Sequence, residues 1–118
     1  MESWALQKYV NSMAYKYRWL QQALDDMSQQ IGYVLSEFGI EAARHAEAKI
    51  HNGIRQLCLF PNSGVRYECM FYNGNQVRIL HIRQIAIIYC VEDVLITIIA
   101  VWNNYQNPDS LRNIIESR

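Results

Sequence analysis

Hydrophobic and polar residues repeat with different periods along this chain, and each period predicts a different element. Between Tyr15 and Trp19, aromatic residues alternate with Lys16 and Arg18, which is typical of a strand with one buried face. We expect the three aromatic residues, Tyr15, Tyr17 and Trp19, to point into the core. This segment is therefore predicted to be the first strand.

The following segment has helical periodicity. From Leu20 to Phe38 the apolar positions recur at steps of three and four, and the polar residues fall elsewhere. The apolar positions are Leu20, Leu24, Met27, Ile31, Val34 and Phe38. Gly39 is expected to end this helix as its C-terminal cap. Asp25 and Asp26 lie outside the apolar stripe, so we interpret them as a solvated face near the helix start rather than an acid–base pair.

A second helical stripe runs from Ile40 to about Leu57, and Pro61 and Gly64 then end the helical part of the chain. The apolar positions of this stripe are Ala43, Ala46, Ile50, Ile54 and Leu57. Because the link between the two helices is so short, they are predicted to form an antiparallel hairpin.

The second half of the chain has the pattern of a β-meander. Val65 to Phe71 alternates, Asn73-Gly74-Asn75 has the composition of a hairpin turn, and Val77 to Ile82 forms the returning strand. Two fully apolar strands follow, Ile85 to Val91 and one that ends near Val101, and the sequence places a Glu92-Asp93 turn between them. A strand without alternation needs cover on both faces, so these two are predicted to be central in the sheet.

A short last helix closes the predicted fold. Asn107 has the residue type of a helix cap and Pro108 suits the first helical position, and Leu111, Ile114 and Ile115 would pack inward. The element order β, α, α, β, β, β, β, α predicts a single α+β domain over residues 13–118, with a mostly antiparallel sheet. Residues 1–12 allow two interpretations, one short amphipathic helical turn or a loose extension, and we favour the loose extension.

Composition narrows the function classes. The 118 residues include 11 basic and 11 acidic side chains, and zero net charge counts against strong binding of nucleic-acid phosphates. The three cysteines, Cys58, Cys69 and Cys90, lie in apolar runs without metal spacing, so we interpret them as buried free thiols of a reducing compartment. No apolar run approaches the roughly 18 residues that span a bilayer. We therefore expect a cytoplasmic protein with no metal, no cofactor and no membrane contact.

Several local motifs, taken in order, resemble a known family. Phe60-Pro61 ends the second helix, Ile87 to Asp93 reads Ile-Ile-Tyr-Cys-Val-Glu-Asp, and Val101-Trp102-Asn103-Asn104 is followed by Asn107-Pro108. Together with the strand and helical hairpin before them, they resemble the RelE/ParE superfamily of bacterial toxins from type II toxin–antitoxin pairs. The resemblance covers roughly residues 14–111.

Membership would imply a compact sheet backed by the helical hairpin, and a cognate antitoxin that wraps the toxin with a helix or an extended segment. It would leave the target open, because some members cut messenger RNA on the ribosome and others poison DNA gyrase without being nucleases. The frequency of each activity in the family favours messenger-RNA cleavage as the leading hypothesis.

Ribosome-dependent cleavage needs a proton acceptor, cations near the phosphate and an acid for the leaving oxygen. By resemblance to the cutting members, the candidate catalytic residues are Tyr105 beyond the last strand, and Arg78, His81 and Arg83 on or near the middle strands. Alternation would put His81 and Arg83 on one side and Arg78 on the other, which weakens a triad. The alternative interpretations are a tyrosine at the start of the final helix, a satisfied edge histidine and solvated strand arginines.

Two departures from the cutting members weaken the enzyme hypothesis. Ala86 stands where those members commonly have arginine, and Asn103 and Asn104 follow Trp102 where arginine is also frequent. Neither alanine nor asparagine can neutralise the charge that develops on the phosphate. A gyrase-poisoning toxin, or a disarmed member that retains antitoxin binding alone, therefore stays open beside the ribonuclease.

An antitoxin buries apolar surface and finds complementary charge on its toxin. The candidate partner-binding residues are Arg66, Met70, Tyr72 and Trp102. Met70 and Tyr72 fall on the expected polar side of their strand, which suggests exposure for a partner. For Trp102 the alternative is that it closes the core.

Overall fold

The structure, a computed structural model, describes residues 15–104 and 106–118, and over this range it contains the predicted order of elements. These are β1 (Lys16–Trp19), α2 (Gln21–Phe38), α3 (Ile40–Leu59), β2 (Val65–Tyr72), β3 (Asn75–Ile82), β4 (Ile85–Glu92), β5 (Leu95–Asn103) and α4 (Pro108–Ser117). The predicted extension of residues 1–12 lies outside the described residues. Within the described part, no helix combines the length and apolar character needed to cross a bilayer.

One sheet with the strand order β1-β5-β4-β3-β2 forms the centre of the molecule. Strands β2 to β5 are an antiparallel meander, whereas β1 runs parallel to β5. The two fully apolar strands are central, as predicted, and residues 86–90 and 96–102 are buried. The turn between them falls at Asp93 and Val94, one residue later than predicted, with Asp93 at φ 53°.

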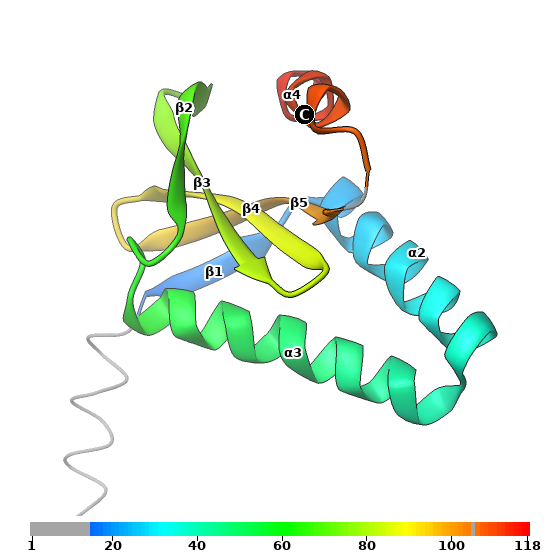
Figure 1. Cartoon of the computed structure of the whole chain (residues 1–118). Helices are drawn as coiled ribbons and strands as arrows, with labels where there is room; N and C mark the ends of the chain where they lie inside the picture. The colour runs from blue at the N-terminus through cyan, green and yellow to red at the C-terminus, as the bar shows by residue number, and fades with distance from the viewer. Residues whose placement is uncertain (1–14, 105) are drawn as a thin grey trace, which may run out of the picture.

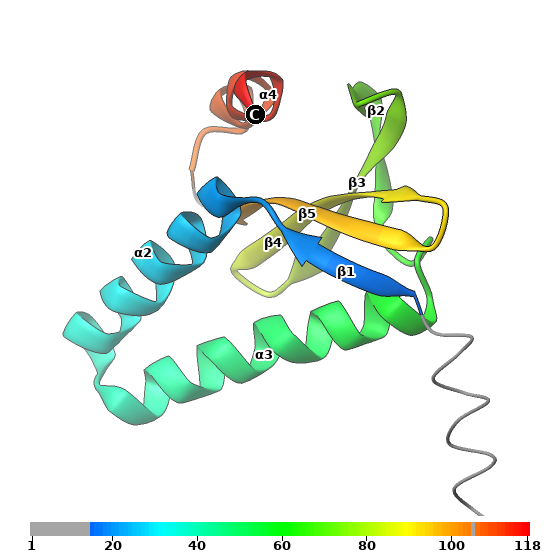
Figure 2. The ribbon, with the colours of Figure 1, turned by 180° about the vertical axis from the view of Figure 1, so that it is seen from behind.

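The sheet separates two hydrophobic layers, and α3 and α4 lie on its opposite sides (Figures 1 and 2). On one face, Ile50, Ile54 and Leu57 of α3 pack against residues such as Ile87 and Tyr89 of β4. On the other face, the buried side chains of α4, Leu111 and Ile115, cover a layer that includes Met70, Ile88, Cys90 and Trp102. The short helix α4 therefore covers one face of the sheet, and α3 covers the other.

The helical hairpin is open rather than packed along its length. Gly39, at φ 91°, joins α2 directly to α3, and the two helices diverge from it as a V (Figures 1 and 2). Ala23 is the buried residue of α2, and Phe38, predicted to lie in the apolar seam, is 69% exposed. The predicted helical hairpin is present, but its tip extends beyond the sheet, so Phe38 is not buried as its place in the apolar seam suggested.

A wide bulge in β2 changes the faces of its residues. Four residues, 67–70, lie opposite the single residue Val77, and Cys69 adopts φ 59°. The Gln76 amide stabilises this bulge by donating to the carbonyls of Tyr67 at 2.7 Å and Met70 at 3.1 Å. As a result Met70 points inward and is 3% exposed, which contradicts the predicted alternation.

Two further expectations are corrected at exposed positions. Tyr17 is 50% exposed because β1 is a four-residue edge strand, although its neighbours Tyr15 and Trp19 pack against the α3 layer as predicted. Among the cysteines, which are free, Cys90 is buried, Cys58 is half-buried and Cys69 is exposed at the β2 bulge. Burial, assisted by nearby Glu92, raises the pKa of the Cys90 thiol to about 11.

The free edge of β5 beyond β1 is closed by side chains. Strand β1 ends beside Ile98, and Ile99 forms a bulge opposite β4. The Asp26 carboxylate of α2 accepts from the Val101 amide at 3.1 Å, and Arg118 donates to the Ile99 carbonyl at 2.9 Å. Both terminal guanidinium nitrogens of Arg118 also donate to the Asp26 carboxylate. The Arg118 side chain is 12% exposed and the Asp26 side chain is 20% exposed. Asp26 is thus a structural anchor between α2, β5 and the end of α4, not the solvated residue that the sequence suggested.

The loop that follows α3 is anchored by one buried tyrosine. The Tyr89 hydroxyl donates to the Pro61 carbonyl at 2.8 Å and accepts from the Gly64 amide at 2.9 Å. Burial raises the pKa of this hydroxyl, so it stays protonated and able to donate. A Cβ at Gly64 would lie 2.6 Å from the Tyr89 oxygen and 2.9 Å from the Ile79 carbonyl oxygen.

We predict that Asp26→Asn lowers the free energy of unfolding by about 1–3 kcal/mol, because a partly buried Arg118 loses its charged partner. Asp25→Asn is the matched control, since Asp25 is exposed and accepts an exposed hydrogen bond from the neighbouring Gln21 side chain at 3.1 Å. Urea unfolding followed by circular dichroism measures both. Equal stability of the two variants would contradict the anchoring role.

We predict opposite effects for two glycine substitutions. Gly64→Ala should destabilise by about 1–3 kcal/mol, because the added methyl group meets Tyr89 and a fixed carbonyl. Gly32→Ala, in the middle of α2 with nothing within 4 Å of the added Cβ, should stabilise by roughly 0.5–1 kcal/mol. Thermal unfolding of both variants provides the comparison, and a stabilised Gly64→Ala would refute the close packing at Tyr89.

Candidate functional site

A cleft of 210 Å³ opens on the α4 face of the sheet, at the end of β5. Its base is a cross-strand row, because His81 pairs with Ala86 and Ala86 pairs with Trp102. Paired residues on adjacent strands share one face, so the imidazole and the indole lie on the same side. The cleft is lined by Tyr67, Ile79, His81, Ala86, Trp102, Asn104, Gln106, Pro108 and Leu111.

The rim of this cleft is built by the segment after β5. The Asn104 amide and side chain donate to the Gln84 and Arg83 carbonyls, both at 2.8 Å, which ties the rim to the β3–β4 turn. Asn107 caps α4 by accepting from the Asp109 amide at 3.0 Å, and Pro108 is the first residue of α4, as predicted. Tyr105 lies outside the described residues, so its catalytic role stays a prediction.

The other candidate catalytic residues do not meet in the cleft. His81 lines it, but Arg78 is on the opposite face, where it pairs across from Tyr89 and donates to the Gly64 carbonyl at 2.9 Å. Arg83 is not on a strand at all, because β3 ends at Ile82 and Arg83 occupies the tight turn with φ 55°. The expected placement of Arg83 beside His81 on a strand face is therefore wrong.

Electrostatics of the cleft follow from this arrangement. The described residues that line the cleft include no lysine and no arginine, and His81 contributes their one imidazole. Arg112 of α4 lies over the ring of Tyr67, with its Cζ 5.5 Å from the ring centroid. A single exposed imidazole supplies no fixed positive charge for a developing phosphorane. The described part of the cleft is suited to stacking and amide hydrogen bonding more than to phosphate chemistry.

The residues predicted to bind a partner are divided by burial. Met70 and Trp102 are 3% and 7% exposed, so they belong to the core in the isolated chain, and the inferred exposure of Met70 is wrong. Tyr72 is half-buried against the same layer. Arg66 is exposed and donates to Gln76 at 3.5 Å, and Phe71, not Met70, presents its ring to solvent with 58% exposure.

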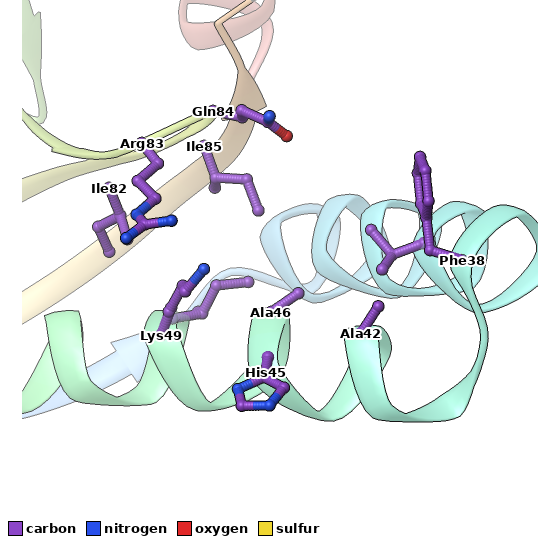
Figure 3. A pocket seen from close by; sticks show the side chains of 11 residues that line it. Phe38, Ala42, His45, Ala46, Lys49, Ile82, Arg83, Gln84 and Ile85 are labelled. Atoms are coloured by element: carbon purple, nitrogen blue, oxygen red, sulfur yellow. The ribbon is translucent and has the colours of Figure 1, made fainter.

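A second hollow, the V-groove, lies between α2, α3 and the β3–β4 turn and has a volume of 260 Å³. Figure 3 shows its side chains projecting from all three elements. Its lining residues are Val34, Phe38, Ala42, His45, Ala46, Lys49, Ile50, Ile82, Arg83, Gln84 and Ile85. Sequence reasoning missed this site. The available signal was that His45 and Lys49, four residues apart, border the apolar stripe of α3.

Comparisons with known proteins agree with this architecture. Residues 17–108 match the family model described as ParE toxin of type II toxin–antitoxin system, parDE. A solved structure titled chromosomal ParDE TA system from P. aeruginosa is similar with a TM-score of 0.62 and 19% identity, covering 77% of this chain and 97% of that one. No curated protein sequence matches significantly.

The structural likeness supports the fold, and the family match extends from β1 to the first residue of α4, including both central strands. It thus spans the helical hairpin, the meander and the rim of the cleft. This chain belongs to the ParE toxin family of type II toxin–antitoxin systems.

Proposed function

We propose that this chain is a growth-inhibiting toxin that acts on DNA gyrase by binding it, without cleaving RNA, and that a cognate antitoxin neutralises it. The observation that carries the proposal is the lack of convergent cations in the described cleft. Arg78 holds the loop after α3, Arg83 lies in a turn and Ala86 occupies the base of the cleft. The ParE family match adds support, because non-nuclease gyrase poisons occur among toxins of this superfamily.

Charge supports the same proposal. With 11 basic and 11 acidic residues, the chain has no general attraction for RNA phosphates and must recognise its target by shape and local contacts. The surface that we assign to the target is α4 with the rim before it. Its N-terminal half is exposed at residues 106–110, and α4 is attached to the sheet through Leu111, Ile115 and the Arg118–Asp26 pair. Because gyrase and an antitoxin are cytoplasmic proteins, the proposal also implies that this chain acts in the bacterial cytoplasm.

Messenger-RNA cleavage, the leading hypothesis from family frequency, is the alternative target mechanism. It would need Tyr105, together with His81, to supply acid–base chemistry that no described arginine assists. We therefore rank it second.

The prediction is that inducing the chain alone in a bacterium arrests growth with intact transcripts, and that purified chain changes gyrase-dependent supercoiling of a plasmid. Asp109→Lys combined with Asn113→Lys, both exposed on α4, should relieve arrest by disturbing the target contact. Glu41→Lys combined with Asn52→Lys, both exposed on α3 and outside the two hollows, is the control because it changes the net charge by the same amount elsewhere on the surface. Mapping of RNA ends and gel analysis of plasmid topology measure the two mechanisms.

A ribonuclease gives the opposite pattern. Transcripts would carry new ends, Tyr105→Phe or His81→Ala would abolish those cuts and restore growth, and supercoiling would be unchanged. Absence of arrest on induction, with antitoxin binding retained, would instead identify a disarmed family member.

A further inference from the structure

The chain contains the dipeptide Asn-Gly twice, and the structure places the two copies in opposite environments. Asn52-Gly53 lies in the interior of α3, and Asn73-Gly74 forms the tight turn between β2 and β3. This dipeptide is chemically fragile, because glycine has no Cβ to keep its amide nitrogen away from the asparagine side chain. One molecule therefore shows how structure controls the same reaction at two places.

The turn copy is open to solvent. Asn73 and Gly74 are both exposed, and a Cβ built on Gly74 would meet no heavy atom within 4 Å apart from its chain neighbours. Their φ angles, 50° and 80°, are those of the two-residue turns that favour Asn-Gly. Among the described residues, the Gly74 amide has no hydrogen-bond acceptor, and the Asn75 side chain donates to the Asn73 carbonyl at 3.3 Å. An exposed, unpaired amide is accessible to hydroxide, which can remove its proton.

The helical copy is closed. Gly53 is buried, and a Cβ there would lie 3.2 Å from Ile87 Cδ1 and 3.4 Å from Leu80 Cδ2, so its backbone packs directly on the sheet. In the interior of a helix, its amide donates to the carbonyl four residues earlier. Arg55 donates to the side-chain oxygen of Asn52 at 3.2 Å and so orients that amide at the surface. Attack by the Gly53 nitrogen would require α3 to unwind and to leave the sheet.

We propose that Asn73 is a site of spontaneous deamidation and isoaspartate formation in the folded chain, whereas Asn52 is protected. The deprotonated Gly74 nitrogen attacks the side-chain carbonyl carbon of Asn73 and forms a five-membered succinimide. The side-chain nitrogen takes up a proton from water and leaves as ammonia. No oxidant or reductant takes part.

Water then opens the succinimide at one of its two carbonyls. Opening at the former side-chain carbonyl gives aspartate. Opening at the former main-chain carbonyl gives isoaspartate, in which the main chain runs through the former side chain. Both products add one negative charge to a chain whose formal net charge is zero.

Ring closure requires local opening of the turn, and the position of the turn makes this opening small. Strand β2 is an edge strand beside β3, and the turn lies at the end of the β2–β3 hairpin that is remote from α3 (Figures 1 and 2). Two residue pairs, Tyr72 with Asn75 and Phe71 with Gln76, separate the turn from the β2 bulge. Short exposed ladders of this kind open at low free energy, whereas packed helix interiors do not.

The two products differ in their effect on the hairpin. Aspartate keeps the main chain intact, and Asp-Gly suits the same turn. Isoaspartate adds a methylene to the main chain of the turn, so the neighbouring pairs lose their register. Gln76 belongs to one of these pairs, and its amide holds the bulge that turns Met70 into the layer under α4. Isoaspartate at position 73 therefore loosens the edge of the sheet and the packing of Met70.

The proposal goes beyond the proposed function and is tested on the purified chain alone. The folded full chain is incubated at mildly alkaline pH, and both peptides are followed by mass spectrometry with fragmentation that distinguishes isoaspartate from aspartate. Asn73 should deamidate at least about tenfold faster than Asn52, since tenfold in rate is about 1.4 kcal/mol and opening a packed helix interior needs more. The rate at Asn73 should rise with pH, because the attacking nitrogen must lose its proton. In urea, where both sites are unfolded, the two rates should become similar.

Two variants connect the chemistry to its structural consequence. Asn73→Gly removes the reacting side chain and leaves Gly-Gly, which also suits the turn. Asn52→Gln is the matched control, because it alters the other copy and leaves the turn unchanged. After equal incubation, the unaltered chain and Asn52→Gln should accept methyl groups from an isoaspartyl carboxyl methyltransferase and unfold at lower urea concentration than before incubation. Asn73→Gly should do neither.

Three results would overturn the proposal. The first is equal deamidation of Asn73 and Asn52 in the folded chain. The second is a folded chain that forms no isoaspartate at Asn73 although the urea-unfolded chain does. The third is an Asn73→Gly variant that gains methyl groups and loses stability on incubation as much as the unaltered chain, which would assign the change to another residue.

Discussion

Two strands without a polar face determine this structure, because β4 and β5 lose stability wherever water reaches either side of them. Residues 86–90 and 96–102 are buried, and this apolar surface is more than one helix can cover. The chain therefore places α3 on one face and α4 on the other, and adds β1 and β3 along the edges of the pair. The two hollows and the polar anchors described above lie where these elements stop covering β4 and β5.

The helices cover the sheet incompletely at its ends, and the V-groove and the cleft both lie there. Helices α2 and α3 are longer than the strands they serve, so their junction at Gly39 projects beyond the sheet and leaves the V-groove open. On the other face, α4 is short, and the cleft beside Trp102 lies where α4 begins. The anchors that hold these edges, Tyr89 for the loop and Asp26 with Arg118 for α4, are polar groups satisfied at the boundary of the core.

The cleft and the V-groove lie on opposite faces of the sheet. The two faces of the sheet carry different chemistry. One face has a rim of amide and aromatic groups next to a short helix, and the other has an apolar channel bordered by Lys49 and Arg83. Since the central strands separate the two surfaces, substitutions on one should leave the other intact.

By itself, the sequence determined the order of elements, the central position of the two apolar strands, the Gly39 and Asn107 caps and the family, because these depend on local periodicity, residue type and motifs. Only the tertiary structure decided which residues meet. The bulge held by Gln76 turned Met70 inward, the tight turn removed Arg83 from its strand, and Asp26 found a partner 92 positions away in Arg118. Bulges and long-range pairs leave no periodic trace in a sequence, since they arise when elements of unequal length are fitted around one core. The V-groove is the same kind of feature, because its walls come from three segments whose separate patterns each predict only a buried face.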